Sequence, residues 1–216
     1  MQINADISQR VVVNSHGLPW TDSPMAGVQR RMLERDGDEI ARATSIVRYM
    51  PGSFFEQHTH DGGEEFLVLD GVFSDETGDF PAGMYVRNPI GSRHKPHTKE
   101  GCRILVKLRQ FNAADRNVVR IDTKNADWKP GHRCGIHVMH LHEYGSEHVA
   151  LMKWEPGARC NRRSYPRGME IYVMAGTLSD EYGTYSAGTW IRSPAGFSHA
   201  PHSTGGCLVY IKTGHL

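Results

Sequence analysis

Three histidines and one glutamate in the first half of the chain have the spacing of metal ligands. The first two histidines are separated by one residue, so on a strand their side chains would share a face. Gly-rich turns at 61–63 and 89–91 would bring the glutamate and the third histidine to the same place. Three imidazoles and one carboxylate suit one divalent ion such as Zn, Fe, Mn or Ni, rather than Mg or Ca. The candidate metal ligands are His58, His60, Glu64 and His94.

A duplication relates the two halves of the 216-residue chain. Shifted by 105 residues, positions 51–107 match positions 156–212 at 21 of 57 places without a gap. Such self-similarity at a fixed offset is the signature of a repeated structural unit. We therefore expect two tandem domains: residues 1–110 as a metal-binding domain and residues 111–216 as a copy without the ligands.

Short apolar runs between Gly and Pro turns predict an all-β chain. Residues 135–154 alternate with period two around a turn at 144–146, which predicts a hairpin. The repeat transfers this hairpin to residues 27–43, with its turn at Asp36-Gly37. No amphipathic segment of helix length remains, so each half is expected to be a sandwich or small barrel. Further strands are expected at 66–69, 84–86, 104–107, 171–174, 189–191 and 209–212.

Two motifs resemble those of the cupin family: Gly52-x5-His58-x-His60-x3-Glu64-x6-Gly71 and Gly83-x5-Pro89-x-Gly91-x2-His94. More narrowly, His-Thr-His before Gly-x-Glu-Glu, then Val-Leu-Asp-Gly-x-Phe-Ser-Asp-Glu-Thr-Gly and His-x-Pro-x4-Gly-Cys, resemble the ChrR-type cupin, the C-terminal domain of zinc-dependent anti-sigma factors. The resemblance implies two tandem cupin barrels (double-stranded β-helix, or jelly-roll). It also implies zinc, with iron as the second choice, at His58, His60, Glu64 and His94. Glu65 is the second choice of carboxylate, but strand parity turns it away from Glu64.

ChrR-type anti-sigma factors also carry an N-terminal helical domain that contacts the sigma factor and holds its own zinc ion. Residues 1–26 are too few for that domain, and the sequence contains no His-x3-Cys-x2-Cys. We therefore do not expect inhibition of a sigma factor by that route. The resemblance is compatible with a homodimer, although no sequence feature indicates one.

The second half keeps the turns of the first half but not its ligands. At the 105-residue offset the corresponding pairs are His58 and Arg163, His60 and Tyr165, Glu64 and Met169, and His94 and His199. A single histidine cannot hold a divalent ion, so we expect a structural partner domain. The alternative is a retained small-molecule pocket gated by Arg163 and Tyr165.

Other histidines and cysteines have simpler interpretations. His140 and His142 are separated by one residue on a predicted strand, and we expect them to face solvent, with metal binding as the alternative. Cys102 and Cys207 begin the last strand of each copy, where a buried free thiol is the usual state. A redox-sensing thiol is the alternative there.

Strand parity predicts an apolar wall near the metal, with Phe54 on the face of His58, and Phe66 and Val68 on the face of Glu64. Such a wall suits a small organic ligand or dioxygen. Two functional classes follow. One is a metal-binding sensory or regulatory cupin. The other is a mononuclear non-haem iron dioxygenase acting on a small carbonyl compound. The sequence fixes neither the substrate nor whether the protein is an enzyme.

Composition excludes several other partners. With 25 Lys and Arg against 24 Asp and Glu, the net charge is +1, so we expect no nucleic-acid binding. The longest apolar run, Cys207–Ile211, is far shorter than a membrane span. Residues 1–15 contain only Val11–Val13 as an apolar block, which is too short for a secretory signal, so we expect a cytoplasmic protein.

Overall fold

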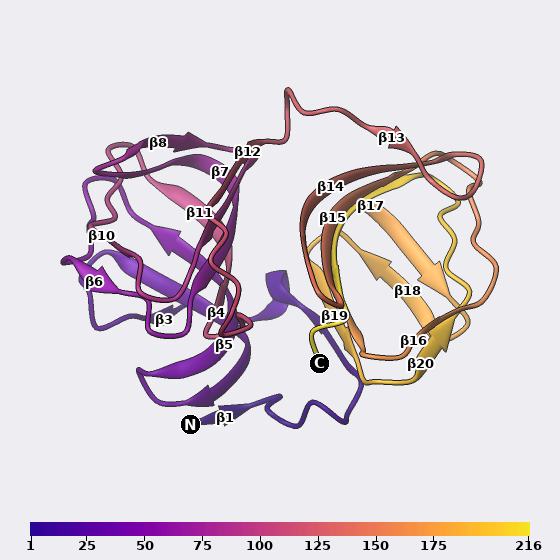
Figure 1. Cartoon of the computed structure of the whole chain (residues 1–216), viewed down its shortest axis with the longest axis horizontal. Coiled ribbons are helices and arrows are strands. Elements are labelled where there is room, and N and C mark those ends of the chain that lie inside the picture. The colour runs from indigo at the N-terminus through magenta and orange to yellow at the C-terminus, as the bar shows by residue number, and fades with distance from the viewer. The chain divides into compact units, whose positions relative to one another are not determined.

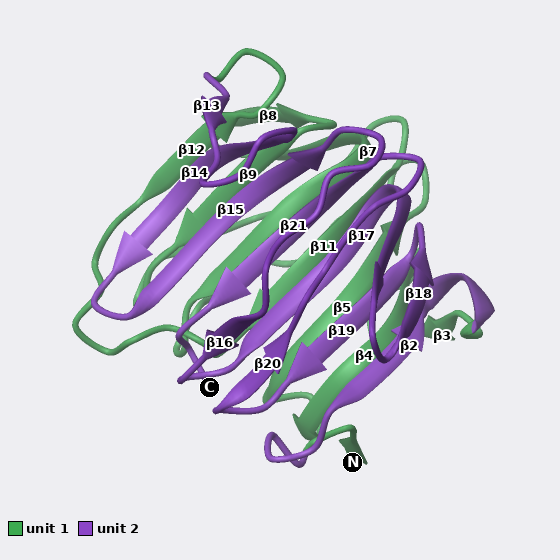
Figure 2. Cartoon of the chain, turned by 90° about the vertical axis from the view of Figure 1, so that its right-hand side faces the viewer, with its two compact units in different colours: residues 1–5, 18–126 green, residues 6–17, 127–216 purple.

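The computed structural model describes all 216 residues as an almost entirely β protein whose only helix is the short 3-10 turn η1 (Ser15–Gly17). The chain forms two compact units (Figures 1 and 2). Unit 1 comprises residues 1–5 and 18–126, and unit 2 comprises residues 6–17 and 127–216. The expected all-β fold is confirmed, and each unit is a jelly-roll barrel. No helix has the length and hydrophobicity needed to cross a bilayer.

Unit 1 is built from one long twisted sheet and a short two-stranded one. The long sheet has the order β1-β4-β5-β11-β7-β9-β12, with β3 added to β4 and β8 added to β7, and the short sheet pairs β10 with β6. The strands are β1 (Gln2–Ile3), β3 (Thr21–Asp22), β4 (Val28–Gly37), β5 (Ala41–Tyr49), β6 (His58–Thr59), β7 (Glu64–Asp75), β8 (Gly78–Pro81), β9 (Met84–Asn88), β10 (Arg93–His94), β11 (Cys102–Leu108) and β12 (Val119–Asp122).

Unit 2 repeats this plan. Its long sheet has the order β13-β14-β15-β21-β17-β19-β2, with β18 added to β17, and its short sheet pairs β16 with β20. The strands are β2 (Val11–Asn14), β13 (Lys129–Pro130), β14 (Ile136–Tyr144), β15 (Glu147–Trp154), β16 (Arg163–Tyr165), β17 (Met169–Asp180), β18 (Gly183–Ser186), β19 (Thr189–Ser193), β20 (Phe197–His199) and β21 (Cys207–Thr213).

Both expected hairpins are present. In unit 1, β4 and β5 pair antiparallel from Val28 opposite Tyr49 to Gly37 opposite Ala41, so residues 27–43 are not helical. The turn lies at residues 38–40, and the expected turn at Asp36-Gly37 is wrong because both of these residues still pair with β5. In unit 2, β14 and β15 pair around the turn at Gly145-Ser146. A β-bulge in β14 between His140 and His142 breaks the alternation. As a result His140 is exposed, as expected, but His142 is buried, and the expectation that both face solvent is wrong.

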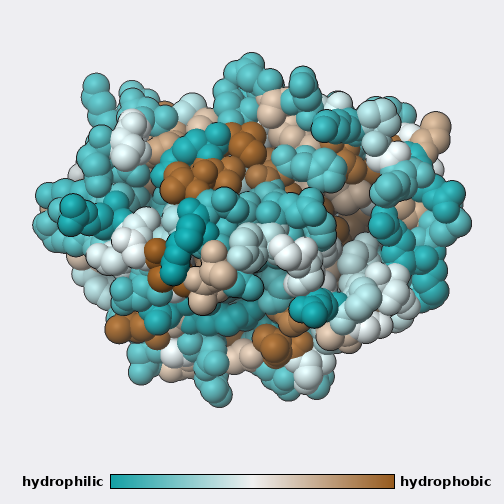
Figure 3. Space-filling view, viewed as in Figure 1, coloured by the Kyte–Doolittle hydropathy of each residue, from teal (hydrophilic) through white to brown (hydrophobic).

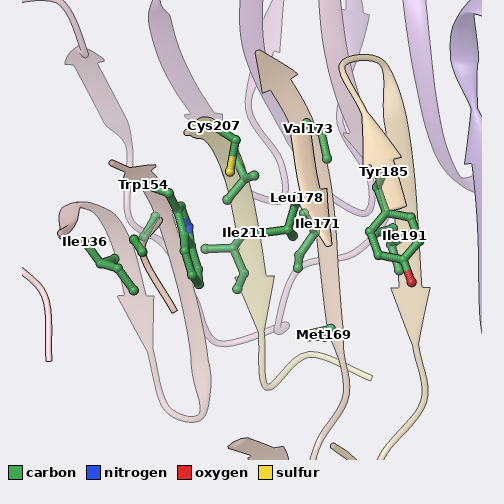
Figure 4. Close-up of a cluster of buried hydrophobic side chains, with 13 residues drawn as sticks. Ile136, Trp154, Met169, Ile171, Val173, Leu178, Tyr185, Ile191, Cys207 and Ile211 are labelled. Atoms are coloured by element: carbon green, nitrogen blue, oxygen red, sulfur yellow. The ribbon is translucent and has the colours of Figure 1, made fainter. Parts of the chain in front are cut away.

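Each barrel has its own apolar core. In unit 1 the core includes Phe66, Phe73 and Val86, all at most 1 % exposed. In unit 2 it includes Trp154 and Ile171, and Figure 4 shows these side chains converging from several strands. The face of the molecule in Figure 3 is mostly hydrophilic, with scattered apolar residues. Burial of these apolar side chains is the main favourable contribution to the folding of each unit.

A buried arginine anchors the last strand of each long sheet. In unit 1, Arg87 on β9 is fully buried and binds Glu65 and Asp115, and its guanidinium lies 3.9 Å from the Phe111 ring centroid. Asp115 precedes β12, which pairs with β9. In unit 2, Arg192 on β19 donates to the Asp6 carbonyl oxygen at 2.6 Å, just before β2, which pairs with β19. The arginine repeated at the 105-residue offset therefore has the same structural role in both units.

Candidate metal centre

The short sheet β6–β10 positions two of the candidate ligands. His58 on β6 and His94 on β10 lie directly opposite one another in this antiparallel pair. The two strands are also neighbours in Figure 1. The His60 amide donates to the Ser92 carbonyl oxygen at 2.8 Å, which holds His60 beside the same sheet. Backbone hydrogen bonds thus hold the three histidines close together.

Glu64 completes the cluster from the first position of β7. The turn at 61–63 allows this placement, because Gly63 has φ +77 and an added Cβ there would lie 2.4 Å from the Phe111 ring. The ligand atoms of His58, His60, Glu64 and His94 all lie within 4.8 Å of one another. The structure thus brings all four sequence-derived candidates together. Glu65 points the other way, toward Arg87, as strand parity predicts.

Two imidazole nitrogens in the cluster have no hydrogen-bond partner. The Nε2 atoms of His60 and His94 are buried and unpaired, and each lies 3.5 Å from Oε2 of Glu64. Buried polar atoms normally have a hydrogen-bond partner, so two unpaired nitrogens facing one carboxylate indicate a site for a shared cation. Atoms bound to one metal ion at about 2.1 Å lie at most about 4.2 Å apart, so a small inward shift of flexible side chains would suffice. The cluster could bind one metal ion.

Hydrogen bonds to the outer ring nitrogens orient the histidines. His94 Nδ1 lies 3.1 Å from Oδ2 of Asp75, and His58 Nδ1 lies 2.9 Å from the Glu56 carbonyl oxygen. Because a carbonyl oxygen and an ionised carboxylate only accept, Nδ1 is the donor in both cases. Each ring therefore presents Nε2 to the cluster. Metal-binding histidines in proteins are typically held in this way.

The Glu64 carboxylate is held by an amide. Asn88 on β9 donates to Oε2 of Glu64 at 3.0 Å, and Arg120 on β12 donates to the Asn88 side-chain oxygen at 2.6 Å. The latter contact orients the amide so that its NH2 group must face Glu64. The added strand β12 therefore reaches the cluster through Asn88.

Electrostatics in the cluster favour the cation-binding forms of Glu64 and His60, but not that of His94. Burial alone would raise the pKa of Glu64, but His60, His94 and the Asn88 amide outweigh it and the pKa is lowered. Burial lowers the pKa of His60, which favours its neutral form. Burial would also lower the pKa of His94, but Asp75 and Glu64 reverse this and raise it. Asp75 is buried too, yet hydrogen bonds from His94 and Thr77 lower its pKa to about 2.

A cavity of about 550 Å³ adjoins the cluster inside unit 1. Small-molecule sites typically have volumes of about 300–1,000 Å³. The lining includes three of the four candidate ligands, His58, His60 and Glu64. Its apolar wall consists of Met25, Val28, Ile40, Ala41, Val47, Tyr49, Phe55, Ile104, Val106 and Leu108.

The wall expected from strand parity is wrong in its details. Phe54 is 45 % exposed, whereas its neighbour Phe55 lines the cavity. Residues 52–57 form a turn and an irregular segment rather than a strand, so the parity of His58 does not extend back to Phe54. Phe66 and Val68 are buried in the core of unit 1 and do not reach the cavity.

Sequence reasoning missed the residues that support the ligands, Asp75 and Asn88. Asp75 did carry a signal, because it repeats as Asp180 at the 105-residue offset. Asp180 in turn lies 2.9 Å from Nδ1 of His199, so both units keep a carboxylate–imidazole pair. Asn88 has no such signal, since Ser193 stands at its place in unit 2.

These features define a cupin with two barrels. The family model described as the ChrR Cupin-like domain matches the chain twice, over residues 8–112 and 116–216, and the chain belongs to this family. No curated protein matches the sequence.

Solved structures with the same fold are distant in sequence. A candidate dioxygenase from Nostoc punctiforme matches with a TM-score of 0.78 and 14 % identity, covering 96 % of this chain and 83 % of its own. Protein YlbA from E. coli matches with a TM-score of 0.73 and 15 % identity, covering 98 % and 93 %. A deletion mutant of Bacillus subtilis oxalate decarboxylase matches with a TM-score of 0.62 and 13 % identity, covering 94 % and 77 %. At these identities the likeness shows the fold alone.

Proposed function

We propose that this protein is a metal-dependent cupin that binds a small organic molecule or dioxygen at one divalent metal ion. Unit 1, which contains most of the expected first domain (1–110), is the metal-binding unit. Unit 2, which contains most of the second (111–216), holds no metal. The ion is bound by His58, His60, Glu64 and His94. The observation that carries this proposal is the pair of buried, unpartnered Nε2 atoms of His60 and His94 beside a cavity of about 550 Å³.

We infer zinc as the first choice of metal and iron as the second. Three nitrogens and one oxygen fit either metal, and the likeness to zinc-dependent ChrR-type cupins favours zinc. A bound metal of this kind supplies a Lewis acid, or a redox centre if it is iron. The chain supplies the remainder: Asn88 holds the carboxylate ligand, and Asp75 holds the imidazole of His94. Apolar residues such as Phe55 and Val106 exclude bulk water beside the cluster.

A sensory or regulatory role is the function we propose for such a site. It requires that the metal, or a ligand held beside it, changes the state of unit 1. The cluster joins β6, β7 and β10, so loss of the ion would remove a link between the short sheet and the long sheet of unit 1. An ion held by all three elements would couple their positions, which is how metal occupancy becomes a structural signal.

Metal content of the full-length protein, purified without chelator, tests the proposal. We expect close to one equivalent of zinc or iron per chain by elemental analysis. His60→Ala and Glu64→Ala should abolish it. His199→Ala, which changes the corresponding histidine of unit 2, should leave it unchanged. Two equivalents in the unaltered protein, or full retention in His60→Ala, would overturn the assignment.

The second candidate is a mononuclear non-haem iron dioxygenase acting on a small carbonyl compound. The apolar part of the cavity wall favours it, because such a wall accommodates an organic substrate and excludes water. Protein loaded anaerobically with ferrous iron would be mixed with small diketones and hydroxyketones, and oxygen uptake followed. Uptake that depends on the carbonyl compound and is lost in Glu64→Ala supports the enzyme. Tight native zinc without uptake supports the sensory function.

A further inference from the structure

Unit 2 contains a cavity of its own, of about 520 Å³, at the place that corresponds to the cavity of unit 1. The cavity has the size of a small-molecule site. Its apolar lining includes Val138, Met152, Trp154, Ile171, Leu178 and Val209. The barrel that lost the metal ligands has therefore kept an internal apolar space.

Polar groups at one end of this cavity replace the metal ligands of unit 1. Arg163 on β16 lies directly opposite His199 on β20, in the register that His58 and His94 have in unit 1. Tyr165, at the position of His60, packs edge-on against His199 with ring centroids 5.6 Å apart. All three residues line the cavity. The sheet that would present three imidazoles now presents a guanidinium, a phenol and one imidazole.

Two buried polar atoms beside this cavity have no partner. His199 is 1 % exposed, and its Nε2 is unpaired because Asp180 binds only Nδ1. Trp154 is 5 % exposed, and its Nε1, which can only donate, is also unpaired. Buried groups of this kind normally have a hydrogen-bond partner, so a ligand that carries polar as well as apolar groups suits this cavity.

The charge at the second cavity favours an anion. In unit 1 the cavity is lined by two arginines and by four carboxylates, those of Glu39, Glu56, Asp61 and Glu64. In unit 2 the lining contains Lys129 and Arg163 but a single carboxylate, that of Glu143, which lies 3.6 Å from His148 Nδ1. The position of Glu64 is taken by the buried Met169. The same scaffold has thus exchanged a cation-binding electrostatic environment for an anion-binding one.

We propose that unit 2 binds a small organic carboxylate without a metal, with its carboxylate at the donors of Arg163 and Tyr165 and its apolar body against Trp154 and Met152. The guanidinium of Arg163 forms charge-assisted hydrogen bonds with the carboxylate. A carboxylate with an aromatic or branched aliphatic body uses both ends of the site, whereas a small inorganic anion uses only one. This inference does not depend on the metal site of unit 1.

Calorimetric titration of the full-length protein tests the proposal, with benzoate as the probe. The titrations use metal-free protein, and are repeated with His60→Ala, because a carboxylate could also bind a metal ion in unit 1. We expect one binding event of equal strength in both proteins. Benzamide lacks the charge and acetate lacks the apolar body, and each should bind at least about tenfold more weakly than benzoate.

Adjacent arginines give a matched pair of variants. Arg163→Gln should weaken benzoate about tenfold or more, and Arg163→Lys should restore part of the loss. Arg162→Gln should leave binding unchanged, because the side chain of Arg162 pairs with Glu181 at 2.6 Å and does not line the cavity. Ala150→Leu, which fills the cavity while leaving Arg163 in place, should also abolish binding.

Four results would overturn the proposal. One is absence of benzoate binding at millimolar concentrations in folded, metal-free protein. Another is equal affinity for benzoate and benzamide, and the third is equal loss in Arg162→Gln and Arg163→Gln. Loss of binding in His60→Ala alone would place the carboxylate in unit 1 instead. None of these results bears on metal content, so failure here is distinguishable from failure of the metal site.

Discussion

His94 lies directly opposite His58 in the two-stranded sheet of unit 1, and its Nδ1 is held by the Asp75 carboxylate. The repeat preserves this arrangement in unit 2 around His199 and Asp180, although Arg163 there takes the place of His58. A backbone frame that positions one supported imidazole has therefore been kept in both barrels. The residues around that imidazole decide which ligand the frame can take.

The first prediction concerns the carboxylate that orients His94. Asp75→Asn keeps the shape of the side chain but removes its charge, so the His94 ring loses its strongest orienting partner. We expect metal affinity to fall by about tenfold to a hundredfold, as is usual when the partner of a metal-binding histidine is lost. Competition with a chelator of known affinity measures the change. Asp180→Asn is the control and should leave metal affinity unaltered; a similar loss in both variants would show a general effect on folding.

The second prediction concerns the buried arginine that anchors β12. Asp115→Asn leaves Arg87 in place with one of its two carboxylate partners neutralised, and both Arg87 and Asp115 are fully buried. Removing one partner from a buried ion pair costs about 3–5 kcal/mol, and the remaining Glu65 should reduce this to about 2 kcal/mol.

Asp70→Asn provides the comparison for that variant, because Asp70 pairs with Arg103 on the surface of the same unit. An exposed pair contributes about 0–1 kcal/mol. Urea unfolding of the two variants should separate them clearly. Equal midpoints would show that Arg87 does not depend on Asp115.

The pairing of the edge strands near Arg87 and Arg192 could not be predicted from the sequence. The repeat and the period-two alternation predicted the hairpins and the barrel strands, because register in a sheet follows the apolar pattern. They did not predict that β2 pairs with β19 and β12 with β9. Duplication has made the two sheet edges alike, and apolar segments such as Val11–Val13 fit either edge. Only the three-dimensional structure distinguishes them.

The candidate site could likewise be predicted only in part. The four candidate ligands could be grouped from the sequence because each stands next to a turn with a fixed spacing. The cavity wall could not be predicted, because parity arguments require a continuous strand and Phe54 lies in an irregular segment. A bulge defeated the same argument at His142. Strand parity is thus reliable for a few residues from a known ligand and fails at the first turn or bulge.

The third prediction concerns two glycines with left-handed backbone. Gly71 has φ +68, and an added Cβ would lie 2.1 Å from the carbonyl oxygen of Gly101. Gly52 has φ +75 but open space around it. Gly52→Ala should therefore cost only the conformational strain, about 1 kcal/mol, whereas Gly71→Ala should cost several times as much because β11 must move.

Thermal unfolding of the two glycine variants checks this difference. Gly176→Ala in unit 2 should behave like Gly71→Ala, since its Cβ would lie 2.2 Å from the Gly206 carbonyl oxygen. Equal costs for Gly71→Ala and Gly52→Ala would mean that the close approach to Gly101 is easily relieved.

The fourth prediction concerns the thiols. Burial raises the pKa of Cys102 to about 12 and also raises the pKa of Cys207, whereas Cys134 is exposed. Only the thiolate reacts with alkylating agents, so at pH 8 the native protein should be modified at Cys134 first. Cys102 and Cys207 should resist until the protein unfolds, which mass spectrometry of peptides can follow over time. Rapid modification of Cys102 in the folded protein would instead support the redox-sensing alternative for that thiol.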